Sequence, residues 1–69
     1  MFNEVLQKQM EQLVGKRVRL IEMNDPYPIP SGTEGTIINV GFDVYTVRWD
    51  NDRILGLVEG EDKFEVLQD

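Results

Sequence analysis

The sequence has no cysteine and no histidine among its 69 residues. Without cysteine there is no disulfide to supplement a small core and no thiolate for catalysis. Without histidine the chain lacks the commonest general base, a common zinc ligand and the near-neutral pH switch. No apolar run approaches the roughly 18 residues of a membrane-spanning helix, and the first residues lack the features of a signal peptide. These absences predict a cytoplasmic protein outside the membrane, with no enzymatic activity, metal site or cofactor.

The composition that remains is that of one small acidic domain. The length allows a single domain, and hydrophobic residues make up 41% of it, which is typical of a folded protein. Thirteen acidic residues against seven basic ones give a net charge of −6. This charge repels nucleic-acid phosphate and makes nucleic acid an unlikely partner.

Residues 1–14 are predicted to form an N-terminal amphipathic helix, with its helical stretch at 2–14. Apolar residues recur there at the i, i+3, i+4 spacing of a single stripe, and Gly15 suits the left-handed cap at the helix end. Because so short a helix is marginal alone, the stripe must pack on something. Two alternatives stay open: the helix covers one end of the domain, or it pairs with a second copy in a homodimer. The stripe consists of Phe2, Val5, Leu6, Met10, Leu13 and Val14.

Residues 15–69 are predicted to be mainly β. From Gly15 the apolar period changes to two, and a stiff loop with Pro26, Pro28 and Pro30 follows the first strand. Gly56 inside the fourth strand predicts a bulge or a close backbone approach. Five short strands in about fifty residues favour a small closed barrel without exposed edges. The strands are expected at residues 16–23, 36–40, 44–49, 53–58 and 63–67.

Several motifs in this stretch resemble a known family. The runs GKRVRLIEMNDPYPIPSGTEGTI, VRWDN and LGLVEGEDKFEVL are similar to the domain-of-unknown-function family 4314, small proteins of bacteria, phages and mobile elements. The resemblance covers Gly15 to Leu67 and leaves the N-terminal helix outside the shared pattern. It implies an SH3-like five-stranded barrel and frequent occurrence in phages and mobile elements, and it implies no activity.

The acidic turns do not form a metal or catalytic motif. Asp50, Asp52 and Glu61 fall at positions of a calcium-binding loop, but Leu55 stands where that loop needs glycine for its sharp turn. Paired carboxylates need a shared cleft for acid–base work, and a barrel of this size has little room for one. We interpret these residues as solvated turns.

Two aromatic residues beside acids are candidate binding residues. Tyr27 lies in the proline loop next to Asp25, and Trp49 ends the third strand next to Asp50. Exposed Tyr and Trp are favoured at interfaces because they contribute large contact area at a low entropy cost. The alternative is that Trp49 fills the core and Tyr27 folds back over it.

Arginines on the strands are the second set of candidates. Guanidinium groups suit phosphate or carboxylate ligands, so a cationic patch could bind an anionic, nucleotide-like molecule. The alternative is cross-strand pairing with acids such as Glu22 and Glu65. The residues are Arg17, Arg19, Arg48 and Arg53.

The leading hypothesis is a non-catalytic binding module for a protein partner, acting through the proline loop and neighbouring strand ends. In a phage or mobile-element setting it would inhibit a host defence system. The alternatives are an oligomer that sequesters a nucleotide-like signalling molecule and a nucleic-acid-binding accessory domain. The candidate binding residues are Asp25, Tyr27, Arg48, Trp49, Asp50 and Arg53.

Overall fold

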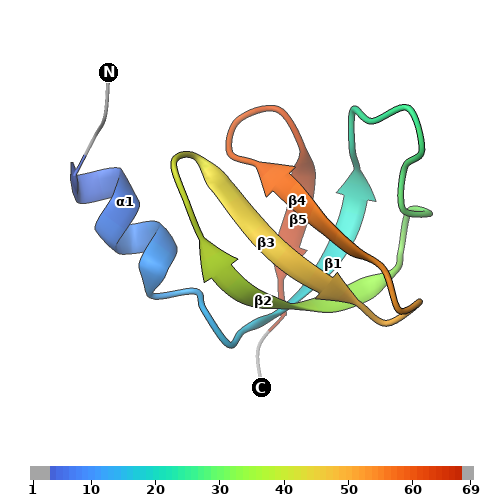
Figure 1. The fold of residues 1–69 in the computed structure, drawn as a ribbon, viewed down its shortest axis with the longest axis horizontal. Helices are drawn as coiled ribbons and strands as arrows, with labels where there is room; N and C mark the ends of the chain where they lie inside the picture. The colour runs from blue at the N-terminus through green and yellow to red at the C-terminus, as the bar shows by residue number, and fades with distance from the viewer. Residues whose placement is uncertain (1–3, 68–69) are drawn as a thin grey trace.

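The computed structural model describes residues 4–67 of the chain. One helix precedes five strands, and all five strands belong to a single antiparallel sheet with the order β4-β3-β2-β1-β5 (Figure 1). The mainly-β prediction is therefore confirmed. The elements are α1 (Glu4–Glu11), β1 (Arg17–Glu22), β2 (Glu34–Val40), β3 (Val44–Trp49), β4 (Ile54–Val58) and β5 (Lys63–Val66).

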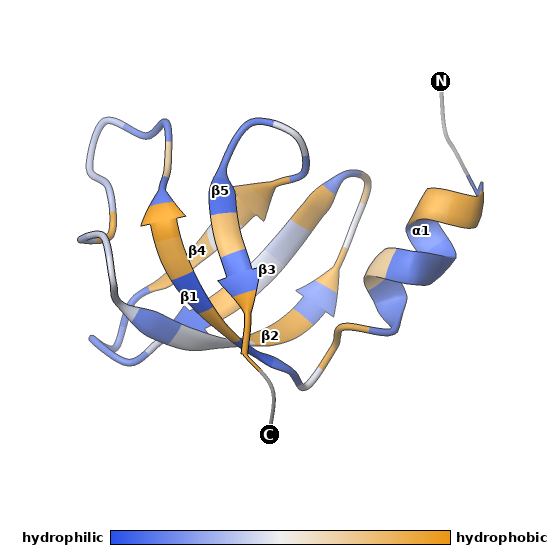
Figure 2. Cartoon of the chain, turned by 180° about the vertical axis from the view of Figure 1, so that it is seen from behind, coloured by the Kyte–Doolittle hydropathy of each residue, from blue (hydrophilic) through white to orange (hydrophobic). Residues whose placement is uncertain are grey.

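The alternation of apolar residues correctly predicted which side chains enter the core. On β3, Tyr45, Val47 and Trp49 are buried, and on β1 Val18 and Leu20 are buried while Arg19 and Ile21 are exposed. In Figure 2 the strands carry both hydrophobic and hydrophilic segments, and most of the turns between them are hydrophilic. The core also includes Met10, Ile29, Ile37 and Leu57.

The sheet is curved, but its two end strands are not joined. β4 and β5 are the edges of the sheet, and within residues 4–67 no pairing links them, so the predicted closure without edges is wrong. Curvature brings the inner faces together instead: the Tyr45 ring on β3 meets the Phe64 ring on β5 edge to face, with centroids 5.3 Å apart. The turn between β4 and β5 sends the chain away from β4, and β5 pairs with β1.

Strand boundaries differ from the expectation mainly at β2. The strand begins at Glu34 rather than Thr36, because Gly35 pairs with Val18 on one side and with Trp49 on the other. A Cβ atom at Gly35 would lie 2.8 Å from the carbonyl oxygen of Arg48, so this position requires glycine. Gly56 is also a close approach rather than a bulge, since β3 and β4 pair without a register shift and its Cβ would lie 2.9 Å from Val44.

The helix is shorter than the predicted 2–14, and Phe2 lies outside the described residues. After Glu11 the chain tightens into i→i−3 hydrogen bonds, such as Leu13 N–H to the Met10 carbonyl at 2.9 Å. Gly15, with a φ of 91°, ends this turn and not the helix itself, which ends at Glu11, so the predicted position of the helix end is wrong. Met10 is only 1% exposed, so α1 does contribute to the core, as the covering alternative predicts. In the described part of the chain, no helix has the length and hydropathy to cross a membrane.

Candidate binding surface around the proline loop

Residues 23–33, called here the proline loop, follow β1 and are attached to it by hydrogen bonds. Ile29 is 2% exposed, and its N–H donates to the Met23 sulfur at 3.2 Å. At the return of the loop, the Ser31 hydroxyl donates to the Ile21 carbonyl at 2.7 Å. Gly32, whose φ of 90° favours glycine, donates its N–H to the Leu20 carbonyl at 2.7 Å. The loop is therefore anchored by one buried side chain and several hydrogen bonds.

Tyr27 projects its ring from this anchored loop into solvent. Its side chain is 79% exposed, so the alternative in which it folds back over the core is wrong. Its backbone is held on both sides: Asp25 Oδ1 accepts from the Tyr27 N–H at 2.9 Å, and Arg53 Nη2 donates to the Tyr27 carbonyl at 2.9 Å. The backbone is thus fixed while the ring remains uncovered.

Arg53 is placed by the turn between β3 and β4. Asn51 Oδ1 accepts from its N–H at 3.2 Å, and its carbonyl accepts from the Trp49 N–H at 2.8 Å. Asp52 takes the left-handed conformation, with a φ of 70°, that lets this turn close. The structure therefore brings Asp25, Tyr27 and Arg53 together, although the last residue is distant in the sequence.

Trp49 lies inside the molecule. It is 1% exposed, and its indole N–H donates to the Leu55 carbonyl at 3.2 Å. The alternative that Trp49 fills the core is confirmed, and its ring does not contribute to the surface around Tyr27. On the same strand, Tyr45 is also buried, and this burial, helped by a hydrogen bond to Glu59, raises its pKa to about 12.

Asp50 is directed to the outer face of the sheet, where it binds Arg17. The contact is bidentate, with Arg17 Nη1 to Asp50 Oδ1 at 2.9 Å and Nη2 to Oδ2 at 2.5 Å. The hydrogen bond from the guanidinium lowers the pKa of Asp50, and the same bond raises the pKa of Arg17. Arg17 Nη1 also donates to the Thr36 hydroxyl at 3.1 Å.

The remaining β1 arginine is paired as well. Arg19 Nη1 lies 2.7 Å from Glu65 Oε1, which confirms the predicted pair with Glu65. Glu34 lies 3.5 Å from Arg17 and 3.8 Å from Arg19, so it bridges the two. Glu22, the other predicted partner, lies opposite Lys63 across the β1–β5 pairing. Sequence reasoning missed Glu34 because it was assigned to the loop rather than to β2.

Arg48 lies on the outer face of β3, between Thr36 on β2 and Ile54 on β4. It is exposed, and it takes part in none of the ion pairs that the structure describes within residues 4–67. Of the four arginines considered for an anionic ligand, two therefore bind carboxylates, one binds a backbone carbonyl, and Arg48 is left in solvent.

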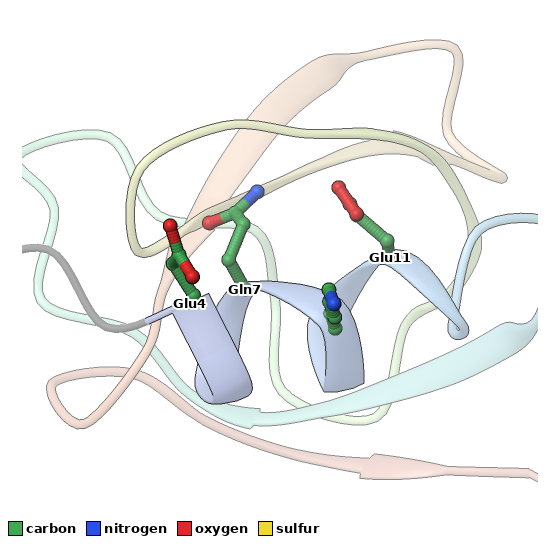
Figure 3. A pocket seen from close by; sticks show the side chains of 4 residues that line it. Glu4, Gln7 and Glu11 are labelled. Atoms are coloured by element: carbon green, nitrogen blue, oxygen red, sulfur yellow. The ribbon is translucent and has the colours of Figure 1, made fainter.

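A hollow elsewhere on the surface runs along α1. Figure 3 shows its lining side chains, Glu4, Gln7, Lys8 and Glu11, all from that helix. It is an open hollow of mixed charge, not a cleft between elements. Across the described residues, 4–67, no three potential metal ligands of the carboxylate, imidazole or thiolate type gather at one point.

Comparison with known proteins gives a family and nothing closer. Neither the curated proteins nor the solved structures yield a match. A family model described as a domain of unknown function (DUF4314) matches residues 3–67. The match includes α1, so the expectation that the helix lies outside the shared pattern is wrong. Since the model covers nearly the whole chain, the protein belongs to the DUF4314 family.

Proposed function

We propose that this protein is a non-catalytic binding module that contacts a protein partner through Tyr27 and the proline loop. The observation that supports the proposal is an aromatic ring 79% exposed on a backbone whose N–H and carbonyl are both hydrogen-bonded. A fixed loop loses little further entropy on binding, and a tyrosine ring contributes large contact area. Asp25 and Arg53 hold the backbone of Tyr27, and their opposite charges would orient a partner.

The geometry favours this proposal over the nucleotide-sequestering alternative. A phosphate at Arg17 or Arg19 would have to displace Asp50, Glu34 or Glu65 from contacts already made. Those carboxylates would then repel the phosphate. Among the candidate arginines, Arg48 and Arg53 have no carboxylate partner within residues 4–67, and the guanidinium of Arg53 already donates to the Tyr27 carbonyl. In the phage or mobile-element setting that the family resemblance implies, the proposed protein partner would be a component of a host system that the domain inhibits.

Site-specific crosslinking tests the proposal. A photo-crosslinking amino acid at position 27 should capture a partner that the same group at position 42 does not. Phe42 is a matched control because it is another aromatic residue, 76% exposed, in the β2–β3 turn. Tyr27→Ala should then weaken binding of the captured partner at least about tenfold, as expected for an interface hot spot.

The same variant should leave the free energy of unfolding unchanged within about 0.5 kcal/mol, because the lost ring is solvent-exposed. Phe42→Ala should bind the partner as tightly as the unmodified protein. Equal affinity of Tyr27→Ala and the unmodified protein would contradict the proposal. Formation of an oligomer on addition of nucleotides, measured by light scattering on a sizing column, would favour the sequestering alternative.

A further inference from the structure

β4 leaves part of its backbone available at the edge of the sheet. In an antiparallel pair, alternate residues direct both backbone groups to the neighbouring strand. The Glu59 N–H donates to Asp43 on the β3 side, and the Arg53 carbonyl accepts from Trp49, so the odd-numbered residues between them face β3. The even-numbered residues Ile54, Gly56 and Val58 therefore face away from it.

Only the last of these three outward positions is occupied by the chain itself. The Val58 N–H donates to Asp62 Oδ2 at 2.8 Å, and its carbonyl accepts from the N–H groups of Glu61 and Asp62. For Ile54 and Gly56, the structure of residues 4–67 contains no hydrogen bond to the outward backbone groups. Two N–H donors and two carbonyl acceptors thus remain in a row.

This edge lacks the protection that the opposite edge has. β5 (KFEV) carries Lys63 and Glu65, and charged residues of this kind discourage strand addition. β4 (ILGLV) has no charged residue and no proline, and Ile54 is 59% exposed. Gly56 has no side chain to stand between its backbone and an approaching strand. Of the two edges, β4 is therefore the less protected against addition of another strand.

Charge determines which strand would fit. The C-terminal end of β4 is negative because acidic residues follow it, whereas at its N-terminal end Asp50 is paired with Arg17 and Asp52 stands beside Arg53. If a second copy of this chain paired with β4 in the parallel orientation, the two acidic C-terminal ends would lie against each other. Such like-charge contacts are unfavourable over about 10 Å or less at ordinary ionic strength. The acidic residues after the strand are Glu59, Glu61 and Asp62.

We propose that the β4 edge binds an extended segment of a partner protein, apolar in its middle and basic at the end that lies along the acidic residues after β4, which adds to the sheet as a further strand. The added segment would exchange backbone hydrogen bonds with Ile54 and Gly56 and cover the Ile54 side chain. This inference rests on the proposed function, since it gives the partner a binding mode. Arg53, which binds the Tyr27 carbonyl, comes directly before Ile54, so the two surfaces adjoin.

A peptide titration followed by NMR tests the mode of binding. The probe is a synthetic peptide of alternating valine and threonine with lysines at both ends, added to isotope-labelled full-length protein. We expect saturable shifts and slower hydrogen exchange at the Ile54 and Gly56 amides. The same peptide with its central amides N-methylated keeps its side chains but cannot donate hydrogen bonds, so it should lose the protection. A glutamate-ended peptide should bind at least about tenfold more weakly than the lysine-ended one.

Variants of the two edges give the matched control. Ile54→Pro removes an outward N–H and should weaken binding about tenfold, as expected for a lost hydrogen bond together with the altered side chain. Val66→Pro makes the equivalent change on β5, since the N–H of the next residue, Leu67, faces β1, and it should leave peptide binding unchanged. If Ile54→Pro does not fold, the N-methylated peptide still decides the question with the unmodified protein.

The following results would overturn the inference: no protection of the Ile54 and Gly56 amides, equal binding of the N-methylated peptide, or equal binding of the glutamate-ended peptide. Protection of the same amides by self-association, rising with protein concentration, would identify a second copy as the occupant and would also overturn it. The proposed function has a separate readout. If crosslinking at position 27 succeeds while the peptide leaves β4 unprotected, strand addition fails and the Tyr27 proposal stands.

Discussion

Trp49 and Tyr27 are both aromatic, but Trp49 is buried and Tyr27 is exposed. Trp49 is 1% exposed and its indole N–H is bound to the Leu55 carbonyl, so both its ring and its polar atom are satisfied internally. Tyr27 is 79% exposed, and the hydrogen bonds around it reach only its backbone. The two regions share a boundary at Arg53, whose carbonyl accepts from Trp49 while its guanidinium donates to Tyr27.

The two regions are therefore ordered by different interactions. Around Trp49, the side chain is ordered because burying it removes apolar surface from water. Around Tyr27, the loop is ordered by polar contacts and by the buried Ile29, while the tyrosine ring stays in solvent, so its order is not explained by burial of the ring. A backbone fixed without that gain is consistent with a surface prepared for another molecule. Four predictions test this comparison.

The largest effect is expected from Trp49→Ala. Removing a fully buried indole should destabilise the fold by about 3–5 kcal/mol, which is most of the stability of a small domain. Chemical denaturation followed by circular dichroism measures the change. Trp49→Phe keeps an apolar ring but loses the bond to Leu55, so it should destabilise less. A Trp49→Ala protein as stable as the unmodified one would contradict the assignment of Trp49 to the core.

Gly35→Ala should have the next largest effect on stability, because it affects the contact between β2 and Trp49. The new Cβ would lie 2.7 Å from the Val47 side chain, 2.8 Å from a backbone oxygen and 2.9 Å from the Trp49 ring. Overpacking of this kind costs about 1–3 kcal/mol. In the proline loop, Gly32 has no atom within 4 Å of the corresponding position, so Gly32→Ala would add only backbone strain at a φ of 90°.

Thermal denaturation compares the two glycine variants, and tryptophan fluorescence distinguishes their causes. The emission of Trp49 should shift in Gly35→Ala and stay unchanged in Gly32→Ala. Gly32→Asn should be milder than Gly32→Ala, because asparagine tolerates the left-handed region better. An unchanged melting temperature in Gly35→Ala would show that β2 can move away from Trp49 without cost.

Tyr45 provides a prediction at high pH. Burial raises its pKa to about 12 in the folded protein, above the ordinary value of 10.0, so the folded state holds the proton more tightly than the unfolded state. The stability that this difference contributes is fully present below pH 10 and is lost as the pH rises through about 12.

Ultraviolet absorbance measures the ionisation of Tyr45. In Tyr27→Phe it is the sole tyrosine, because the chain has two. Phenolate absorbance should appear near pH 12 in the folded protein, and denaturant should bring it down to the ordinary range near 10.0. Glu59→Gln removes a charge that favours the neutral phenol and should lower the Tyr45 pKa. Ionisation of native Tyr45 near pH 10 would contradict its burial.

The smallest effect on stability is expected from Arg53→Gln. The variant loses one exposed hydrogen bond to the Tyr27 carbonyl, which is worth about 1 kcal/mol or less. The consequence for the proline loop should be easier to detect: hydrogen exchange at Tyr27 should become faster while exchange at Val47 in the core stays unchanged. Equal exchange at Tyr27 in both proteins would mean that Asp25 and Ile29 hold the loop without Arg53.

The sequence predicted the strands well because each has one buried face. Alternation placed β3 at its observed limits, and it assigned Tyr45, Val47 and Trp49 to one face. Proline chemistry likewise located the proline loop, whereas Gly15 ends the turn that follows α1 and not the helix. These features are local, so residues a few positions apart are sufficient to identify them.

The candidate surface was only partly predictable, because its geometry depends on contacts between distant residues. Arg53 was identified as a cation, but its acceptor is the backbone carbonyl of Tyr27, and every residue has such a group. Asp50 was identified as a turn residue, but its bond to Arg17 depends on the register of three strands. From the sequence, exposure of Tyr27 could only be proposed. The fold was needed to decide it.

The pairing of β1 with β5 has a consequence for how the chain folds. Arg19 and Glu65 lie side by side although they are 46 positions apart in the sequence. Bringing such distant segments together has an entropic cost, and domains dominated by these contacts fold slowly. During synthesis β1 would pair with β2 early and keep its other edge open until β5 had left the ribosome. β5 thus completes the cooperative unit, and loss of β5 would leave β1 as the edge strand of the sheet.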